Sequence, residues 1–464
     1  MSEKIRKTIT VYVNGNRCNL KCSYCYYTNA NKMGVGKPIQ LEYPIELMIS
    51  AFSPDRIGGI CEIVVIGSAE TLLEESVIPF VHGLLHMGHV VTVVTNGTLT
   101  YRIEQLLKTD RVDIKNLIVK ASLHWTELKR LNLVDKYFDN IKKVIAAGAS
   151  SFPFLVVSDE YLPCLEEIAE TSKKYLGATP HCSPCVEVVN SKSITHKARF
   201  RPECTEGMKQ KINDLFDSQI YNEIVKNREM NPQEIFCYAG VWSWIVDFAT
   251  GAVSKCHGIA TDGTNFYENV EEPFEICNPV ACSCGIESCC LQYNFFTEGL
   301  IPDYDSGMMY GDMIYKEGLV TDYIRNKLNV RFDRLYSRFS KEKESKYILD
   351  NKNLQIENLY AESEKNPFFQ EEIYEKVSEG KEIVLYGTGY NYERYKKTIG
   401  FQYSFFLDSY VSEEKYVDGK RVYRPEEVPL KRYEEIFIVI TTQKKHDIQE
   451  KLEKLGLTRG ENYI

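Results

Sequence analysis

The sequence Thr8-Ile-Thr-Val-Tyr-Val13 leads directly into Asn14-Gly-Asn-Arg-Cys18-Asn-Leu-Lys-Cys22-Ser-Tyr-Cys25. The first segment is rich in β-branched residues, as a β-strand is. The second places three cysteines, spaced CxxxCxxC, immediately behind that strand. Three thiolates can hold three irons of a [4Fe–4S] cube, whereas an ordinary electron-transfer cluster takes four protein ligands. The fourth iron would then stay open for a substrate or a cofactor.

A zinc site and unligated thiols are the alternatives for these cysteines. A structural zinc site takes four ligands, and the first histidine of the chain, His82, lies far beyond the cysteines. Three unligated cysteines in one loop would be an unusual use of a reactive residue. The chain has 15 cysteines, none beyond Cys290, and no export signal. In a reducing compartment such clustered cysteines are more often metal ligands than disulfides, so we expect a cytoplasmic metalloprotein.

The N-terminal part of the chain alternates predicted strands with predicted helices. Strands are expected at 8–13, 62–66, 90–95, 117–122 and 152–157, and helices at 74–87, 126–147 and 162–175. Repeated β–α units imply a parallel sheet, here a full or partial (β/α) barrel. In such folds the chemistry lies at the carboxyl ends of the strands.

The cysteine loop resembles the signature of the radical S-adenosylmethionine (SAM) superfamily, CxxxCxΦC, with Tyr24 as the aromatic residue. The resemblance implies that the open iron binds the amino and carboxylate groups of SAM. One electron, from a donor such as flavodoxin or ferredoxin, then cleaves SAM to a 5′-deoxyadenosyl radical, which abstracts hydrogen from the substrate. Such a cluster is oxygen-sensitive. The protein contributes binding and orientation, and the cofactor contributes the chemistry.

Three later segments resemble further family positions, each at the end of a predicted strand. In Gly67-Ser-Ala-Glu70 the family's second glycine and its proline are absent, but the carboxylate that binds the SAM amino group remains as Glu70. Thr95-Asn96-Gly97 matches the family's Thr-Asn-Gly element. Ser122 matches a position that contacts the ribose or carboxylate of SAM. With Tyr24, the resemblance thus implies Glu70, Asn96 and Ser122 as cofactor-binding residues.

A second cysteine group follows the pattern Cys237-x13-Gly251-x4-Cys256. The segments 242–248 and 252–257 read as a β-hairpin that brings these two cysteines together. This resembles the SPASM and twitch modules, which hold auxiliary [4Fe–4S] clusters. The continuation departs from the SPASM spacing, so one auxiliary cluster is expected, with a second left open and a zinc site as the alternative. The candidate ligands are Cys237, Cys256, Cys277, Cys282 and Cys284.

The pair Cys182 and Cys185 allows two interpretations. It is either a further ligand pair or catalytic thiol, or two partly buried thiols beside a turn.

The last part of the chain begins a new β–α series at Glu382. Gly387-Thr-Gly389 follows a predicted strand and Asp408 ends the next one, as in a dinucleotide fingerprint, but Tyr392 replaces the third glycine. The stretch resembles Rossmann-like modules of polysaccharide-biosynthesis proteins, and a docking or dimerisation domain is the alternative. The expected division is a radical SAM core (1–204), an auxiliary module (205–311), a helical connector (312–380) and a doubly wound α/β domain (381–464).

The composition of the chain limits the classes of partner and substrate that we expect. A net charge of −9 argues against general nucleic-acid binding, and no apolar run is long enough to span a membrane. The predicted core begins at Thr8, which leaves no space for a preceding peptide-docking domain. We therefore expect a sugar, nucleotide-sugar or other cell-surface biosynthetic intermediate as the substrate, with a ribosomally made peptide as the alternative. An iron–sulfur electron carrier or sensor is the alternative that is not an enzyme.

Overall fold

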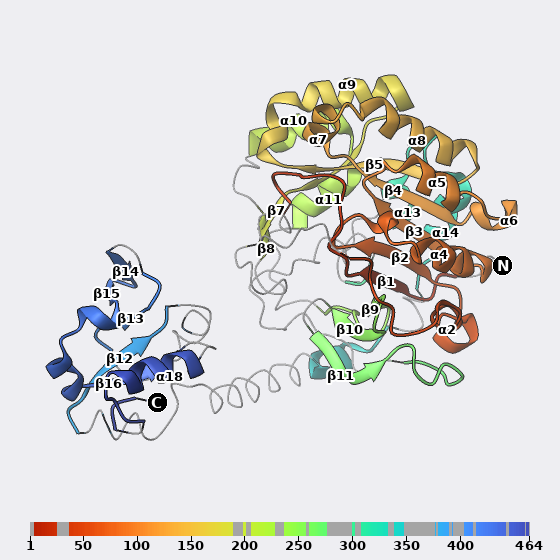
Figure 1. The fold of residues 1–464 in the computed structure, drawn as a ribbon. Helices are drawn as coiled ribbons and strands as arrows, with labels where there is room; N and C mark the ends of the chain where they lie inside the picture. Colours follow the sequence, from red (N-terminus) through yellow and green to blue (C-terminus); the bar gives the residue numbers. More distant parts are fainter. Residues whose placement is uncertain are drawn as a thin grey trace. The chain divides into compact units, whose positions relative to one another are not determined.

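The computed structural model describes residues 4–25, 37–188, 198–200, 206–227, 236–256, 259–275, 299–301, 308–332, 338–347, 376, 379–388, 392, 403–411, 414–441, 445–459 and 461–463. The chain divides into two compact units, residues 1–352 and 353–464. Each unit contains its own main sheet (Figure 1). The four-part division expected from the sequence stays a prediction.

The first unit is built on one large sheet. Among the described residues its order is β11-β10-β9-β1-β2-β3-β4-β5-β6. Neighbouring strands from β9 to β6 are parallel, and β10 and β11 are antiparallel to their neighbours. The strands are β1 (Thr8–Val13), β2 (Glu62–Gly67), β3 (Val90–Thr95), β4 (Leu117–Ser122), β5 (Ser150–Val157), β6 (His181–Pro184), β9 (Ser243–Asp247), β10 (Ala252–Cys256) and β11 (Ile259–Asn265), with β7 (Val186–Val188) and β8 (Ala198–Phe200) forming a separate pair. The order of β1 to β6 follows the chain, so the expected fold class is confirmed.

Helices connect the strands. They are α2 (Ile45–Ser50), α3 (Pro54–Ile57), η1 (Thr71–Leu73), α4 (Val77–His86), α5 (Thr100–Leu106), α6 (Arg111–Ile114), α7 (Trp125–Arg130), α8 (Val134–Ala146), η2 (Asp159–Cys164), α9 (Leu165–Leu176), α10 (Glu206–Phe216), α11 (Gln219–Asn227), α13 (Tyr310–Ile314) and α14 (Asp322–Asn329). The single helix expected at 126–147 is wrong. It is α7 and α8, because Asn132 has a φ of 54°, which ends a helix and which asparagine tolerates.

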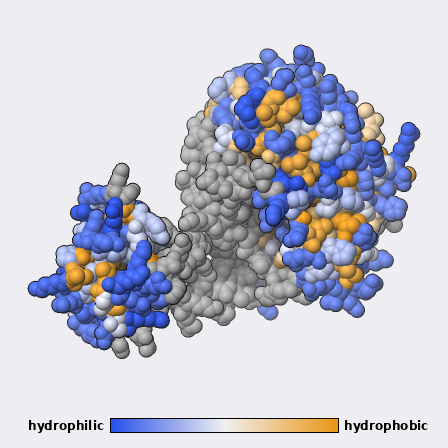
Figure 2. Space-filling view, viewed as in Figure 1, coloured by the Kyte–Doolittle hydropathy of each residue, from blue (hydrophilic) through white to orange (hydrophobic). Residues whose placement is uncertain are grey.

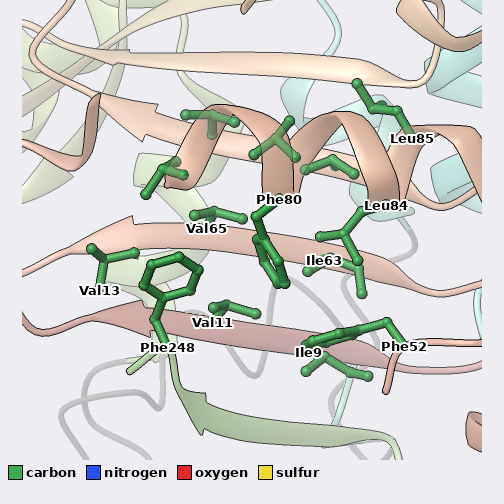
Figure 3. Close-up of a cluster of buried hydrophobic side chains, with 14 of the residues drawn as sticks. Ile9, Val11, Val13, Phe52, Ile63, Val65, Phe80, Leu84, Leu85 and Phe248 are labelled. Atoms are coloured by element: carbon green, nitrogen blue, oxygen red, sulfur yellow. The ribbon is translucent and has the colours of Figure 1, made fainter. Parts of the chain in front are cut away.

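One face of the sheet is fully covered. Alternate side chains of β1 and β2 point to this face and pack against α4 and its neighbours (Figure 3). The buried set includes Ile9, Val11, Val13, Phe52, Ile63, Val65, Phe80, Leu84, Leu85 and Phe248. Each such side chain contributes about 1.5–3 kcal/mol when removed from water. This layer therefore fixes β1 and β2, and with them the loops at their carboxyl ends.

On the opposite face the described residues form a buried layer near one end of the strands. Near the amino ends of the strands, Val90, Ile118 and Phe152 are buried with side chains of α11, α13 and α14. Toward the carboxyl ends the side chains of the same face are half-buried, for example Lys120 and Ser122. This carboxyl half is where parallel α/β sheets bind their ligands.

The hairpin predicted around Gly251 is present as β9 and β10, paired antiparallel. Gly251 has a φ of 73°, and a Cβ there would lie 2.2 Å from the Asn265 side-chain oxygen, so only glycine fits. The sequence did not reveal that β9 also pairs with β1. The hairpin therefore extends the main sheet on the side of the cysteine-bearing strand.

The second unit has a smaller sheet, in the order β14-β15-β13-β12-β16 among the described residues. Its elements are β12 (Glu382–Tyr386), β13 (Phe406–Leu407), β14 (Lys415–Val417), β15 (Lys420–Tyr423), η4 (Pro425–Glu427), η5 (Leu430–Glu434), β16 (Ile436–Ile440) and α18 (Lys445–Lys454). β12 lies between β13 and β16 and is parallel to both. Its carboxyl end is therefore a topological switch point, where open α/β sheets bind ligands.

The described surface is mainly hydrophilic on the face shown in Figure 2, with apolar residues in small groups. Within the described residues, none of the helices has the length and apolarity needed to cross a membrane.

Candidate functional site

The first three cysteines lie on the loop that follows β1, at the carboxyl edge of the sheet. Cys22 is buried, and Cys18 and Cys25 are half-buried. The N–H of Cys25 donates to the carbonyl of Cys22 (3.1 Å), and the N–H of Leu20 points at Cys18 Sγ (3.5 Å). The loop therefore turns back on itself and keeps the three sulfurs within one short segment.

The surroundings of Cys18 and Cys22 oppose the ionisation of their thiols unless positive charge is supplied. Burial raises the pKa of Cys18 to about 11, and it raises the pKa of Cys22 well above its ordinary value. The charges of the other cysteines of the loop add to both shifts, so the three sulfurs lie within electrostatic reach of one another. Since thiolates are the form that binds metal, the triad needs a compensating cation such as cluster iron. The donor set fits a [4Fe–4S] cluster held through three thiolates.

A single ion and a cluster make different demands on these cysteines. A tetrahedral zinc site requires its ligands to converge on one point. In an iron–sulfur cube each thiolate binds a different iron. Among the described residues, no three Cys, His, Asp or Glu side chains are grouped as a site for one metal ion. The assignment of the loop to a cluster stays a prediction.

The start of the loop is fixed to the segment after β2. Arg17 forms an ion pair with the buried Glu74 (3.0 Å) and donates to the carbonyl of Leu73 (2.9 Å). Glu74 also accepts from the N–H of Ile39 (3.0 Å). The carbonyl of Arg17 accepts from the N–H of Glu70 (3.0 Å). The residue before Cys18 is thus held by both its side chain and its backbone.

The carboxylate of Glu70 lies buried between the ends of β2 and β3. One oxygen accepts from the N–H of Leu72 (3.0 Å) and the hydroxyl of Thr95 (2.6 Å), and the other accepts from the N–H of Asn96 (2.8 Å). Burial raises the pKa of Glu70, and these hydrogen bonds partly oppose the rise. The charge of Glu70 also raises the pKa of Cys18, so the carboxylate lies close to the cysteine loop. The contact of Glu70 with SAM stays a prediction.

Asn96 joins the end of β3 to the cysteine loop. Its Nδ2 donates to Asn19 Oδ1 (2.8 Å), and its Oδ1 accepts from the N–H (3.0 Å) and hydroxyl (2.7 Å) of Thr98. Asn19 Nδ2 completes the ring by donating to Thr98 Oγ1 (2.8 Å). A hydrogen bond between the Asn96 side chain and the Cys18 thiol lowers the pKa of that thiol against the effect of burial. Asn96 therefore lies next to the first cysteine.

The second half of the loop is held by α7. The N–H of Lys21 donates to Glu127 Oε2 (2.8 Å), and Glu127 also pairs with Arg130 (2.7 Å). The hydrogen bond from Arg130 lowers the pKa of Glu127, so this carboxylate is ionised at neutral pH.

Tyr24 packs beside the same helix. Its hydroxyl lies 2.5 Å from His124 Nδ1, and its ring stacks on His124 and meets the edge of Tyr161. Burial lowers the pKa of His124 to about 4, so the imidazole is neutral and its Nδ1 shares one hydrogen bond with the Tyr24 hydroxyl. Ser122 ends β4, two residues before His124, and is half-buried. Tyr24 and Ser122 are thus both linked to the region where β4 ends. Contacts of Tyr24 and Ser122 with the cofactor stay predictions.

The second cysteine group is only partly described. Cys237 and Cys256 are buried in one cluster with Phe236, Tyr238 and Trp242. The hairpin thus brings the two cysteines into a common region, as its sequence indicated. Cys277, Cys282 and Cys284 lie outside the described residues, so the ligand set of an auxiliary cluster stays a prediction.

Cys182 lies on β6, on the helix-covered face. It is fully buried among Ile212 and Phe216, and its N–H donates to Ser218 Oγ (2.9 Å). Burial raises the pKa of its thiol well above the ordinary value. These surroundings favour a packing role for Cys182 over a ligand or catalytic role.

At the switch point of the second unit, polar groups on or next to four strands (β12, β13, β14 and β16) meet. Thr388 Oγ1 donates to Asp408 Oδ2 (3.1 Å), and Lys415 Nζ donates to Thr388 Oγ1 (3.2 Å). Thr441 Oγ1 donates to the carbonyl of Gly387 (2.6 Å). Tyr392, at the place of the third glycine, is fully buried. Its ring fills space that a dinucleotide fingerprint leaves to a glycine.

Several residues of the site had no signal in the sequence. Two of them, Arg17 and Asn19, lie on the loop, and three contact it from other segments: Glu74, His124 and Glu127. These contacts are made by the tertiary structure and belong to no spaced motif. Their positions next to strand ends, or next to the first cysteine, were the available indication.

A comparison with curated proteins found a relative of part of the chain. The chain is 30% identical over 172 residues to a 7-carboxy-7-deazaguanine synthase of Hyperthermus butylicus. The match covers 35% of this chain and 62% of the synthase, so the chain spans less than two thirds of that relative. No family model matches the chain.

Similar folds occur among solved structures. SuiB of Streptococcus suis bound to S-adenosylmethionine has a TM-score of 0.40 and 13% identity, covering 58% of this chain and 65% of that one. The protein anSMEcpe with bound AdoMet has a TM-score of 0.40 and 12% identity, and the match covers 76% of this chain and 98% of that one. BtrN in complex with AdoMet and 2-DOIA has a TM-score of 0.29 and 14% identity, and the match covers 69% of this chain and 93% of that one. Such likenesses are too distant to transfer a substrate or a reaction.

The sheet, the cysteine motif and the buried residues around it form one consistent set. The CxxxCxxC loop follows β1 of a parallel sheet, and Glu70 and Asn96 lie beside it at the ends of β2 and β3. These features place the cysteine loop, Glu70 and Asn96 together at the carboxyl edge of the sheet β1–β6.

Proposed function

We propose that this protein is a radical SAM enzyme whose cluster is held by Cys18, Cys22 and Cys25. The observation that carries the proposal is the cysteine loop itself, fixed on one side by Arg17 and Asn19 and on the other by Glu127 and His124. A loop held this firmly keeps its thiolates in a fixed geometry, as a catalytic cluster requires.

The chain's own residues have distinct tasks in this proposal. The three thiolates bind three irons and leave the fourth for the amino and carboxylate groups of SAM. Glu70 offers negative charge to the SAM amino group, and Asn96 and Ser122 supply polar groups at neighbouring strand ends. When bound and reduced, the cluster supplies the electron that splits SAM and starts hydrogen abstraction. The half-buried carboxyl half of the sheet face, with Lys120 and Ser122, is the surface available to the substrate.

We further propose a sugar, nucleotide-sugar or other cell-surface intermediate as the substrate. The switch point of the second unit, with Thr388, Asp408 and Thr441, supports a role for this unit in binding or positioning such a molecule. The buried Tyr392 argues against a dinucleotide there and supports the docking role that the sequence left open. Titrating nucleotides and nucleotide-sugars into the full chain by calorimetry separates the two roles, because only the binding role predicts heat that Asp408→Asn reduces. Turnover of a ribosomally made peptide would support the alternative substrate class.

Cys237 and Cys256 are proposed to hold an auxiliary [4Fe–4S] cluster with two of the three downstream cysteines. The test is metal analysis of the Cys18→Ala, Cys22→Ala, Cys25→Ala triple variant. We expect about four irons per chain to remain, as one [4Fe–4S] cluster requires. About eight would indicate two auxiliary clusters, and zinc in place of iron would refute the auxiliary cluster.

The main test is SAM cleavage. Protein purified and reconstituted without oxygen, then reduced by dithionite or flavodoxin, should form 5′-deoxyadenosine and methionine from SAM. The triple variant should form neither. Product formation by the triple variant would refute the assignment, and an electron carrier or sensor would form no product even as the wild type.

A further inference from the structure

The second half of the cysteine loop contacts two carboxylates from neighbouring connections. Glu127 on α7 accepts the N–H of Lys21 (2.8 Å). Glu160 on η2 accepts the hydroxyl of Ser23 through Oε2 and the hydroxyl of Thr126 through Oε1 (2.9 Å). α7 and η2 follow β4 and β5, so both acids approach the loop from adjacent strand ends.

The two carboxylates differ in how their charge is compensated. Glu127 receives two hydrogen bonds from the guanidinium of Arg130 (2.7 and 2.8 Å). The two partners of Glu160 are neutral hydroxyls, and in the described residues no basic side chain lies within ion-pair distance of it. Its neighbours Glu166 and Glu167, in contrast, pair with Lys211 and Lys129. Glu160 thus places an unbalanced negative charge beside the loop.

The charge of Glu160 reaches the cysteines. Glu160 is half-buried, and its carboxylate accepts from the hydroxyl of Ser23, the residue next to Cys22. Ser23 lies between two of the proposed cluster ligands, Cys22 and Cys25. At a partly buried position the effective dielectric is lower than in water, so a charge acts more strongly on its neighbours.

We propose that Glu160 lowers the reduction potential of the cluster held by Cys18, Cys22 and Cys25; this rests on the proposed function. Reduction adds one electron to the cluster, and a fixed negative charge nearby makes that electron harder to accept. Potentials of iron–sulfur clusters respond to net charge and hydrogen bonding around them. The consequence is that weak reductants leave the cluster oxidised, so that SAM is cleaved only when a strong one-electron donor is bound. Glu160 is a positioning and charge-setting residue and touches neither the irons nor SAM in this account.

The test is a redox titration of the full-length, anaerobically reconstituted protein, followed by electron paramagnetic resonance. The signal that changes on addition of SAM identifies the cluster of interest and separates it from any auxiliary cluster. Glu160→Gln removes the charge and keeps the side-chain shape. We expect the ratio of reduced to oxidised cluster at a fixed potential to rise about tenfold, which is a midpoint shift of about 59 mV for one electron. The matched control is Glu166→Gln, an exposed acid of the next helix, which should leave the midpoint unchanged.

Two further variants test the route of the effect. Ser23→Ala releases Glu160 from the loop and should also raise the midpoint, whereas Thr126→Val keeps the charge in place and should not. A wild-type midpoint in Glu160→Gln, with a wild-type iron content, would overturn the role of Glu160 alone. A wild type whose signal does not respond to SAM would instead overturn the proposed function.

Discussion

Glu70 is the buried acid on which the geometry of the site depends most. Its two carboxylate oxygens accept three hydrogen bonds, two of them from the backbone N–H groups of Leu72 and Asn96. Replacing Glu70 by Ala leaves both N–H groups buried without an acceptor. Replacing it by Gln keeps one acceptor oxygen for Leu72 but turns an NH2 group toward the N–H of Asn96.

The expected losses in the free energy of unfolding follow from these contacts. A buried N–H without a partner costs about 1–3 kcal/mol, so two of them cost about 2–6 kcal/mol in Glu70→Ala. Glu70→Gln leaves one N–H unpaired and should cost about 1–3 kcal/mol. The neighbouring Glu75 is exposed, and Glu75→Gln should stay within about 0.5 kcal/mol of the wild type.

Urea unfolding followed by tryptophan fluorescence measures these losses for the first unit alone. All three tryptophans, Trp125, Trp242 and Trp244, belong to that unit and are buried. The free energy of unfolding should fall in the order wild type, Glu70→Gln, Glu70→Ala, with an unchanged urea dependence. A Glu70→Ala protein as stable as the wild type, or more stable than Glu70→Gln, would refute the role given to this carboxylate.

The wild type and Glu70→Gln also give a pH dependence. Because burial raises the pKa of Glu70 in the folded state, the folded protein binds this proton more tightly than the unfolded chain does. The stability of the wild type relative to Glu70→Gln should therefore fall as the pH rises from the ordinary carboxyl pKa through the raised one. A relative stability that rises over this window would show that the pKa shift has the opposite sign.

Three other substitutions have effects that the structure predicts. His124→Phe keeps a ring beside Tyr24 but removes the hydrogen-bond partner of its hydroxyl, which should cost the first unit about 1–3 kcal/mol in urea unfolding; no loss would contradict the Tyr24–His124 bond. Gly251→Ala should destabilise the same unit by more than about 1 kcal/mol, because the φ of 73° and the Asn265 oxygen both exclude a Cβ, and a stabilising effect would contradict the hairpin geometry. Tyr392→Phe removes hydroxyl contacts to Tyr403 (2.7 Å) and Asp418 (2.6 Å) and should lower the unfolding free energy of the second unit by about 1–3 kcal/mol, as hydrogen exchange of β12 amides can show; unchanged exchange would contradict these contacts.

The sequence was most informative where a local pattern determines the local structure. The strands 8–13, 90–95 and 117–122 lie where their β-branched residues indicated, because buried parallel strands are short continuous apolar runs. The cysteine spacing likewise predicts a cluster site without any tertiary information, and this stays a prediction. Glycine at position 251 indicated the hairpin turn for the same local reason.

Features that depend on distant contacts could not be obtained this way. The pairing of β9 with β1 joins residues more than 200 positions apart, and neither segment contains a signal for the other. The same holds for Arg17 with Glu74 and for Ser23 with Glu160, which meet only because parallel strands end at one edge. The helix break at Asn132 was not predicted either, because a single residue of positive φ interrupts a sequence pattern that is otherwise typical of one helix.

The central claim is that three thiolates leave one cluster iron open to SAM, and one spectroscopic measurement tests it most directly. The electron paramagnetic resonance spectrum of the reduced, anaerobically reconstituted wild type should change when SAM is added, because SAM then binds the open iron. The Cys18→Ala, Cys22→Ala, Cys25→Ala variant should lose this response while any auxiliary-cluster signal remains. A wild-type spectrum that is identical with and without SAM, at full iron occupancy of the loop, would contradict the account.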